Sequence, residues 1–134
     1  MGLDVSHEAW HGAYSSFHRF RMAIAKVIGL DLESMQGYHR YVNGVHCECA
    51  KKPYGVSWDL LKHDAIFCLL NHSDCEGSIP WELLADLAKR LDDIAPLLAA
   101  DASDPESAKW SERASQFANG CRKAIEAHES LEFH

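Results

Sequence analysis

The segment from Ser57 to Leu98 constrains the fold of this chain more than any other. It holds an apolar stretch, a polar turn and a second apolar pattern, which together predict two helices joined by a turn. The first of these helices should run from Trp58 to about Asn71, with Ser57 as its N-cap. Its apolar residues point in nearly every direction around a helix: Leu60, Leu61, Ile66, Phe67, Leu69 and Leu70. We therefore expect this helix to lie at the centre of the fold.

The helix that follows the polar turn 71–77 is amphipathic. Pro80 suits the first position of a helix, where a missing N–H group has no cost, and Pro96 should bend or end the helix near Leu98. The apolar positions recur at three and four residues: Leu83, Leu84, Leu87, Ala88, Leu91, Ile94 and Leu98. This stripe predicts that one face of the helix is buried.

A further helix is predicted at each end of the chain. The first should begin near His7 and end at Gly29, with an apolar stripe that includes Trp10, Ala13, Tyr14, Phe17, Phe20, Ile24, Val27 and Ile28. The last should follow a linker at 101–103, because Asp104-Pro105-Glu106 combines an N-cap with a proline in the first turn.

Residues 38–55 interrupt this helical pattern. Asn43-Gly44 between short apolar runs is typical of a hairpin turn, but the alternation is weak, so we expect mostly loop with a short hairpin at most. The sum is a single all-α domain over residues 1–134. It should form an irregular four-helix bundle with a loop-rich insertion between the first and second long helices.

The charge of the chain is uneven. The net charge is −7, and residues 68–134 carry thirteen acidic against six basic side chains, whereas residues 1–67 carry seven of each. This excess of negative charge repels nucleic acid and anionic membranes, so neither is an expected partner. The longest apolar run, 65–70, is too short to cross a bilayer.

The five cysteines are an odd number, and no signal peptide is recognisable at the start of the chain. Reduced thiols and a cytoplasmic location follow as expectations. A homo-oligomer is compatible with the sequence.

The run His7-Glu8-Ala9-Trp10-His11 matches the H-E-x-x-H pattern of zinc metallopeptidases. There, two histidines one helical turn apart hold zinc and the glutamate activates a bound water. Only six residues precede His7, which leaves no room for the sheet that normally comes before this helix. His18 also falls one residue beyond the metzincin position for a third ligand.

A metal site without peptidase activity is the broader hypothesis. Asp4, His7 and His11 could reach one point near a helix N-terminus, joined there by His72 and Asp74 from the central turn. Imidazole and carboxylate ligands favour a divalent ion, above all zinc. The alternative is that these are capping and solvent-facing residues.

The central turn offers two other metal patterns. His72 to Ile79 resembles half of an EF-hand loop, but Leu83 stands where the bidentate glutamate belongs, so a turn stabilised by polar side chains competes with calcium binding. A second zinc set combines the C-x-C and H-x-x-C pairs: Cys47, Cys49, His72 and Cys75. The alternative is that these thiols are simply buried.

Trp10 and Tyr14 could line a pocket for a planar ligand. Their helical spacing is also typical of core residues, and that alternative stays open.

Four segments carry a resemblance to a known family: Gly2-Leu3-Asp4 through His7, Trp10-His11-Gly12-Ala13-Tyr14, Leu70-Asn71-His72-Ser73-Asp74-Cys75 and Glu132-Phe133-His134. They resemble small proteins from bacteriophages and actinobacteria. The family pattern tolerates aspartate at the Glu8 position, which argues against a water-activating glutamate. A phage origin implies an accessory or anti-defence role, such as binding a host protein or a small signal molecule.

Three functional hypotheses result. The first is a metal-supported binding module of phage origin that binds a protein or a small molecule. The second is a metal-dependent hydrolase in which Glu8 or Asp74 is the general base to a metal-bound water. The third is a scaffold without metal that offers its acidic second half to a basic partner.

Overall fold

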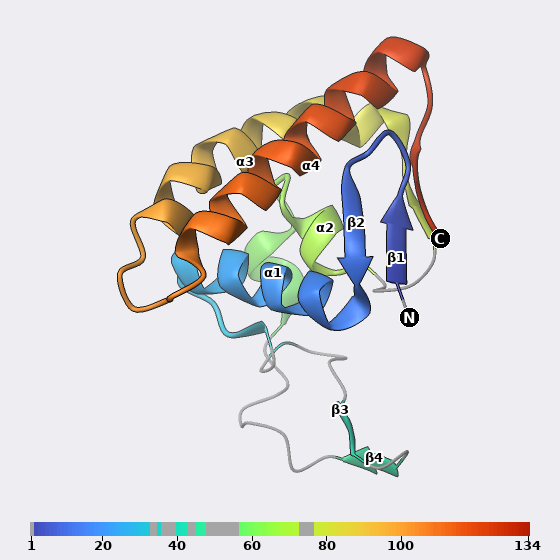
Figure 1. Ribbon diagram of the computed structural model, residues 1–134. Coiled ribbons are helices and arrows are strands. Elements are labelled where there is room, and N and C mark those ends of the chain that lie inside the picture. Colours follow the sequence, from blue (N-terminus) through green and yellow to red (C-terminus); the bar gives the residue numbers. More distant parts are fainter. Residues whose placement is uncertain (1, 33–34, 36–39, 43–44, 48–56, 73–76) are drawn as a thin grey trace.

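The protein consists of helices packed on one face of a four-stranded antiparallel sheet (Figure 1). The computed structural model describes residues 2–32, 35, 40–42, 45–47, 57–72 and 77–134. The sheet has the strand order β2-β1-β6-β5. Its strands are β1 (Gly2–Val5), β2 (Trp10–Ala13), β5 (Gly77–Ile79) and β6 (Leu131–Phe133).

Both ends of the chain meet in the middle of this sheet. Asp4 and His134 exchange two backbone hydrogen bonds, with N···O distances of 3.1 and 2.8 Å, and the Ser6 N–H group donates to Glu132 at 2.9 Å. In β1 and β6 every second residue is buried, and β2 and β5 each add one buried residue; these side chains are Leu3, Val5, Trp10, Ile79, Leu131 and Phe133. The predicted all-α bundle is therefore wrong, because these short segments follow the two-residue period of a strand.

The helices are α1 (Tyr14–Val27), α2 (Phe67–Leu70), α3 (Leu84–Ala99) and α4 (Ser107–Ala127), with short 3₁₀ turns η2 (Trp58–Leu61) and η3 (Trp81–Leu83). α3 and α4 form the main helix pair (Figure 1). α4 follows a turn in which Asp104 Oδ1 accepts a hydrogen bond from the Glu106 N–H group at 2.8 Å.

α1 ends next to Gly29, the residue at which the sequence predicts the end of the first helix. Gly29 has φ +88°, a conformation that favours glycine, and the Leu30 N–H group donates to the Ala25 carbonyl at 2.8 Å. The beginning differs, because α1 starts at Tyr14 rather than near His7. The seven residues in between belong to the β1–β2 hairpin.

The predicted central helix is broken into two pieces. Ser57 caps the first piece by accepting a hydrogen bond from the Asp59 N–H group at 3.2 Å. Asp64 interrupts it, since its Oδ1 atom accepts from the Ile66 N–H group at 3.0 Å. A side chain that binds the backbone locally competes with helix formation, and only α2 continues beyond it.

An aromatic cluster fills the space between the sheet and the helices. Phe17 of α1 stands at its centre, with ring centroids 5.1 Å from Trp10, 5.8 Å from Phe133 and 6.4 Å from Phe117. All four side chains are buried. Because each ring comes from a different element, this cluster fixes the sheet against both α1 and α4.

The predicted insertion does contain a short hairpin. β3 (Arg40–Val42) pairs with β4 (Val45–Cys47) in an antiparallel register that places Val42 opposite Val45. Two residues, Asn43-Gly44, separate the strands, which is the spacing that the sequence pattern suggested; the turn itself lies outside the described residues.

Candidate functional site

The H-E-x-x-H run lies at the tip of the β1–β2 hairpin and not on a helix. The Ala9 N–H group donates to the Ser6 carbonyl at 3.2 Å, and the two central residues of the turn, His7 and Glu8, have φ of 58° and 60°. Positive φ at both central positions is the mark of a type I′ turn, which favours Asn and Gly. His7 and His11 therefore do not share a helix face, so the arrangement of the zinc metallopeptidase motif is absent from this run.

The hairpin tip lies on α4. A Cβ atom added to Gly120 would stand 2.4 Å from the Cβ atom of Ala9, so this helix position accepts the hairpin only as glycine. Gln116 Nε2 donates to the Glu8 carbonyl at 3.0 Å, and Lys123 Nζ lies 3.3 Å from Glu8 Oε1. Three contacts to one helix thus hold a turn whose backbone is unfavourable for its own residues.

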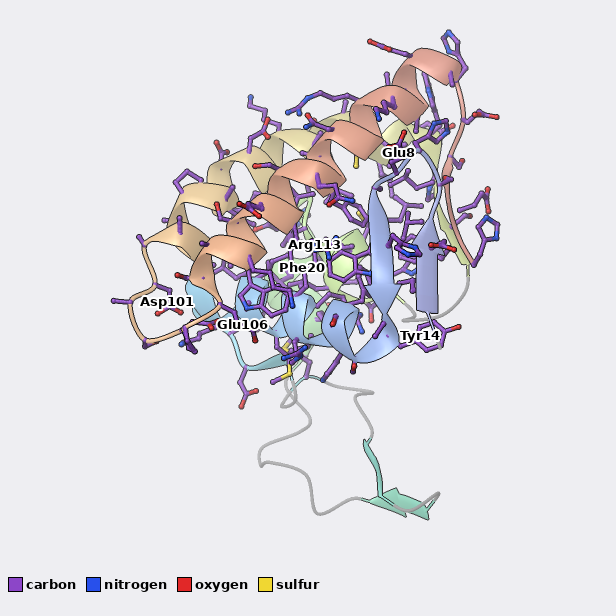
Figure 2. The ribbon with its side chains drawn as sticks, in the orientation of Figure 1. Glu8, Tyr14, Phe20, Asp101, Glu106 and Arg113 are labelled. Atoms are coloured by element: carbon purple, nitrogen blue, oxygen red, sulfur yellow. The ribbon has the colours of Figure 1, made fainter. Side chains whose placement is uncertain are left out.

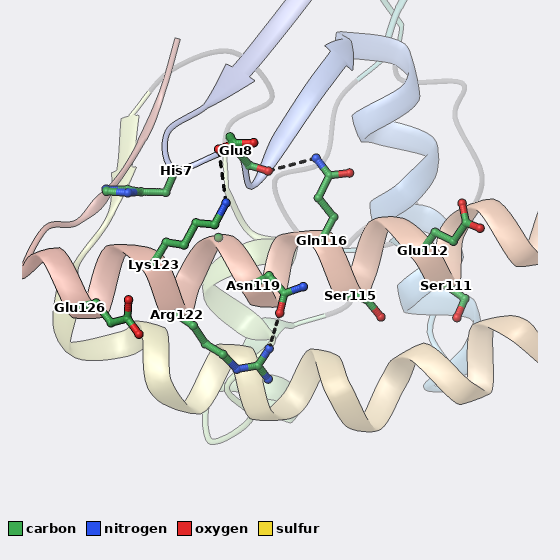
Figure 3. A pocket seen from close by; sticks show the side chains of 11 residues that line it. His7, Glu8, Ser111, Glu112, Ser115, Gln116, Asn119, Arg122, Lys123 and Glu126 are labelled. Atoms are coloured by element: carbon green, nitrogen blue, oxygen red, sulfur yellow. Dashed lines mark hydrogen bonds and ion pairs between the residues drawn. The ribbon is translucent and has the colours of Figure 1, made fainter.

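A groove of about 740 Å³ follows α4 beside this tip (Figure 3). Figure 2 places Glu8 at the hairpin tip beside α4, while Asp101 and Glu106 lie at the far end of the helix pair. The groove is lined by His7, Glu8, Ser111, Glu112, Ser115, Gln116, Asn119, Gly120, Arg122, Lys123 and Glu126. Except for Gly120, every lining side chain has a polar or charged group.

The charges of the groove are only partly balanced. Arg122 forms an ion pair with Asp92 of α3 and donates to Asn119 at 2.8 Å (Figure 3), and His7 Nε2 lies 3.0 Å from Glu129 Oε1. Glu112 and Glu126 are exposed and form no ion pair with any residue that the structure describes. Considering the described residues alone, the groove therefore presents two carboxylates without an ion pair, one on each side of the Glu8–Lys123 pair.

The predicted metal ligands do not meet. Asp4 Oδ1 and His11 Nδ1 form a hydrogen bond across strands β1 and β2, on the face of the sheet that points away from the helices. His72 lies on the opposite face, where its ring stacks on Phe133 at 4.0 Å and its Nε2 atom meets the Ser78 carbonyl at 3.1 Å. His7 turns toward Glu129 instead.

Across the described ranges, no three His, Cys, Asp or Glu side chains are placed to hold a metal ion. The predicted zinc site of Asp4, His7, His11 and His72 is thereby corrected; the expected fifth ligand, Asp74, lies outside the described residues. The physical reason is that Asp4 and His11 pair across the two strands on the outer face of the sheet, whereas His72 stacks on Phe133 and His7 lies in the turn and faces Glu129.

The other metal patterns fall mostly outside the described residues. Of the second zinc set, Cys49 and Cys75 are not described, and the same holds for most of the EF-hand-like loop at 73–76. His72, which both patterns share, packs over Gly77: an added Cβ there would stand 3.3 Å from the His72 ring.

The two aromatic residues expected to bind a ligand lie in different environments. Trp10 is 1% exposed and stacks on Phe20 at a centroid distance of 5.2 Å, so it belongs to the core. Tyr14, the first residue of α1, is half-buried and packs against the edge of the core (Figure 2).

A second cavity, of about 400 Å³, lies between α1 and the start of α4, over the buried ring of Trp110. Its two cations are already engaged: Arg19 Nη1 lies 3.1 Å from Glu106 and Lys26 Nζ lies 3.0 Å from Asp101. These pairs join α1 to the α3–α4 connection, which is a structural role.

Sequence reasoning identified His7 and Glu8 but missed the residues of α4 that complete the groove. The sequence of α4 does show a polar face opposite the apolar stripe. That face carries Glu112, Gln116, Lys123 and Glu126. What the sequence does not reveal is that a hairpin tip lies beside this polar face.

Comparison of the chain with protein-family models, with curated proteins and with solved structures finds no match. The comparisons give no support to the bacteriophage resemblance. Among the described helices, none combines the length and the apolar character that crossing a membrane requires.

Proposed function

We propose that this protein is a non-catalytic interaction module whose α4 groove binds a basic segment of a partner protein. The observation that carries the proposal is the pair of free carboxylates, Glu112 and Glu126, on either side of the exposed carboxylate of Glu8. A net charge of −7 adds a long-range attraction for a cationic partner.

The dimensions of the groove favour a peptide segment over a small molecule. Ser111 and Glu126 bound its ends, and fifteen residues of α-helix rise roughly 22 Å. An extended segment of about seven residues covers that distance. Serine, asparagine and glutamine side chains between the charged groups offer hydrogen bonds to such a backbone.

The role of Glu8 also favours binding over hydrolysis. A general base for a metal-bound water needs a metal beside it. In the described part of the chain, Glu8 faces Lys123 and belongs to no group of metal-ligand residues. Its carboxylate is 86% exposed, which suits contact with a partner.

The proposal is tested with a fluorescein-labelled decapeptide of alternating lysine and serine, measured by fluorescence anisotropy at low and at physiological salt. We expect the wild-type protein to bind the peptide more tightly at low salt. The double variant Glu112→Gln/Glu126→Gln should bind several-fold more weakly, because it lacks both free carboxylates.

The matched control is Asp86→Asn/Asp93→Asn, which removes two exposed carboxylates from α3, outside the groove. It changes the net charge by the same amount and should retain most of the affinity. Equal losses in the two double variants would show that bulk charge, and not the groove, attracts the peptide. Absence of wild-type binding at low salt would refute the proposal.

A further inference from the structure

The Glu8–Lys123 pair lies within the groove, between Glu112 and Glu126 and nearer to Glu126 (Figure 3). Lys123 Nζ lies 3.3 Å from Glu8 Oε1, and the two side chains are 53% and 86% exposed (Figure 3). Glu8 does not depend on this pair for its position, because Gln116 binds its backbone carbonyl and Ala9 rests on Gly120. The ammonium group therefore sits in front of a carboxylate that other contacts already hold.

We infer that Lys123 is an internal competitor that occupies the recognition carboxylate of Glu8 until a cationic side chain of the partner displaces it. The inference rests on the proposed function and deepens it, since it names Glu8 as the central recognition residue. The site that Lys123 fills is one for a cation, and the partner must offer a lysine or arginine side chain at this point.

Displacement of Lys123 from Glu8 by a cationic side chain of the partner has a small free-energy cost. An exposed ion pair between a carboxylate and a long flexible lysine contributes little to folding, so its loss has a small cost. The lysine stem lets the ammonium group move into water without a change in α4. A partner side chain that replaces it gains the interaction with Glu8, and Lys123 then reduces affinity only by competition.

Replacement of Lys123 by a neutral side chain of similar shape tests the inference. Lys123→Met should bind the lysine–serine decapeptide about two- to five-fold more tightly than the wild type. This factor corresponds to the small free energy of one exposed ion pair, which the peptide no longer has to break. The control is Lys89→Met, because Lys89 is exposed on α3 and lies outside the groove. It alters the net charge equally and should tighten binding less.

A second comparison isolates Glu8. When Glu8 is already replaced by Gln, adding Lys123→Met should increase the affinity for the peptide no more than adding Lys89→Met does. A gain that persists there would contradict the inference, because Lys123 would then act on the peptide and not on Glu8. Acylation of Lys123 by an amine-reactive ester, followed by mass spectrometry, should also become faster when peptide saturates the protein.

The outcomes separate the two proposals. If the wild type binds the peptide and Lys123→Met binds no more tightly than Lys89→Met, the competitor role is overturned while the groove remains the binding site. If the wild type does not bind the peptide, the proposed function fails, and the inference fails with it.

Discussion

Ala9 lies directly against Gly120, so that a Cβ atom on Gly120 would stand 2.4 Å from Ala9 Cβ and 2.6 Å from Ala9 Cα. Residues 111 positions apart in sequence thus set the distance between the hairpin tip and α4. Ala9 is fully buried, and one of its obstructing atoms belongs to the backbone, so the hairpin must move if Gly120 gains a side chain.

Gly120→Ala should lower the free energy of unfolding. Alanine favours a helix over glycine by about 1 kcal/mol, but overpacking costs about 1–3 kcal/mol and here it pushes on the backbone. Urea unfolding followed by circular dichroism measures the change. Ser115→Ala, at an exposed position of the same helix, is the control and should leave stability within about 0.5 kcal/mol. A Gly120→Ala variant as stable as wild type would contradict this packing.

Glu8→Gly should stabilise the protein while weakening peptide binding. Glu8 has φ 60°, where a glycine would relieve about 1 kcal/mol of backbone strain. The exposed ion pair with Lys123, which the variant loses, stabilises the fold by less than that. The melting temperature should rise by about 3 °C. Glu8→Ala loses the same carboxylate but keeps its Cβ, so it should not show the rise. Equal melting temperatures for the two variants would mean that the turn is unstrained.

The long helices could be predicted from the sequence because their signals are local. α3 repeats its apolar residues over four turns. α4 follows a turn in which the Glu106 N–H group donates to Asp104, with Pro105 between them. Gly29 ends α1 through hydrogen bonds between residues only a few positions apart. Each of these features is readable within a short window of the chain.

The sheet could not be predicted in the same way, because its strands are short and their partners are distant. β1 is four residues long and pairs with β6, at the other end of the chain. Leu3 and Val5 do alternate with polar residues, but the spacing of His7 and His11 fits one helical turn equally well. The groove could not be predicted for the same reason, since two of its lining residues come from the hairpin tip and nine from the distant helix α4.

Asp64 should matter more for stability than its ion-pair partner Arg90. Arg90 Nε and Nη2 reach the Asp64 carboxylate at 3.0 and 3.2 Å, and Asp64 also accepts from the Ile66 N–H group. Arg90→Met removes only the ion pair, whereas Asp64→Ala also removes a backbone cap that is worth about 1 kcal/mol. Urea unfolding of both variants should therefore show the larger loss for Asp64→Ala. Equal losses would indicate that the cap contributes nothing.

Asp101 should contribute stability that is lost in acid. The Ser103 hydroxyl, and next the Lys26 ammonium, lower the pKa of Asp101 below its ordinary value of 3.8. A carboxyl with a depressed pKa stabilises the fold above pH 3.8, and this contribution disappears as the pH falls through the lower, folded-state pKa. Asp101→Asn should therefore lose less stability than wild type between pH 5 and pH 2, measured by urea unfolding. A loss as large as that of the wild type would exclude Asp101 as a source of this pH dependence.

Cys68 and Cys121 should resist alkylation in the folded protein. Burial raises the pKa of Cys68 from 9.0 to about 11 and the pKa of Cys121 to about 12, and thiols react as thiolates. Iodoacetamide at pH 8, followed by peptide mass spectrometry, should label both sites much more slowly in buffer than in urea. Because the unfolded thiols ionise at lower pH than the folded ones, stability should also fall as the pH rises from about 9 toward 12. The double variant Cys68→Ala/Cys121→Ala should lose less stability over that range, and a fall as steep as that of the wild type would exclude these thiols as its cause.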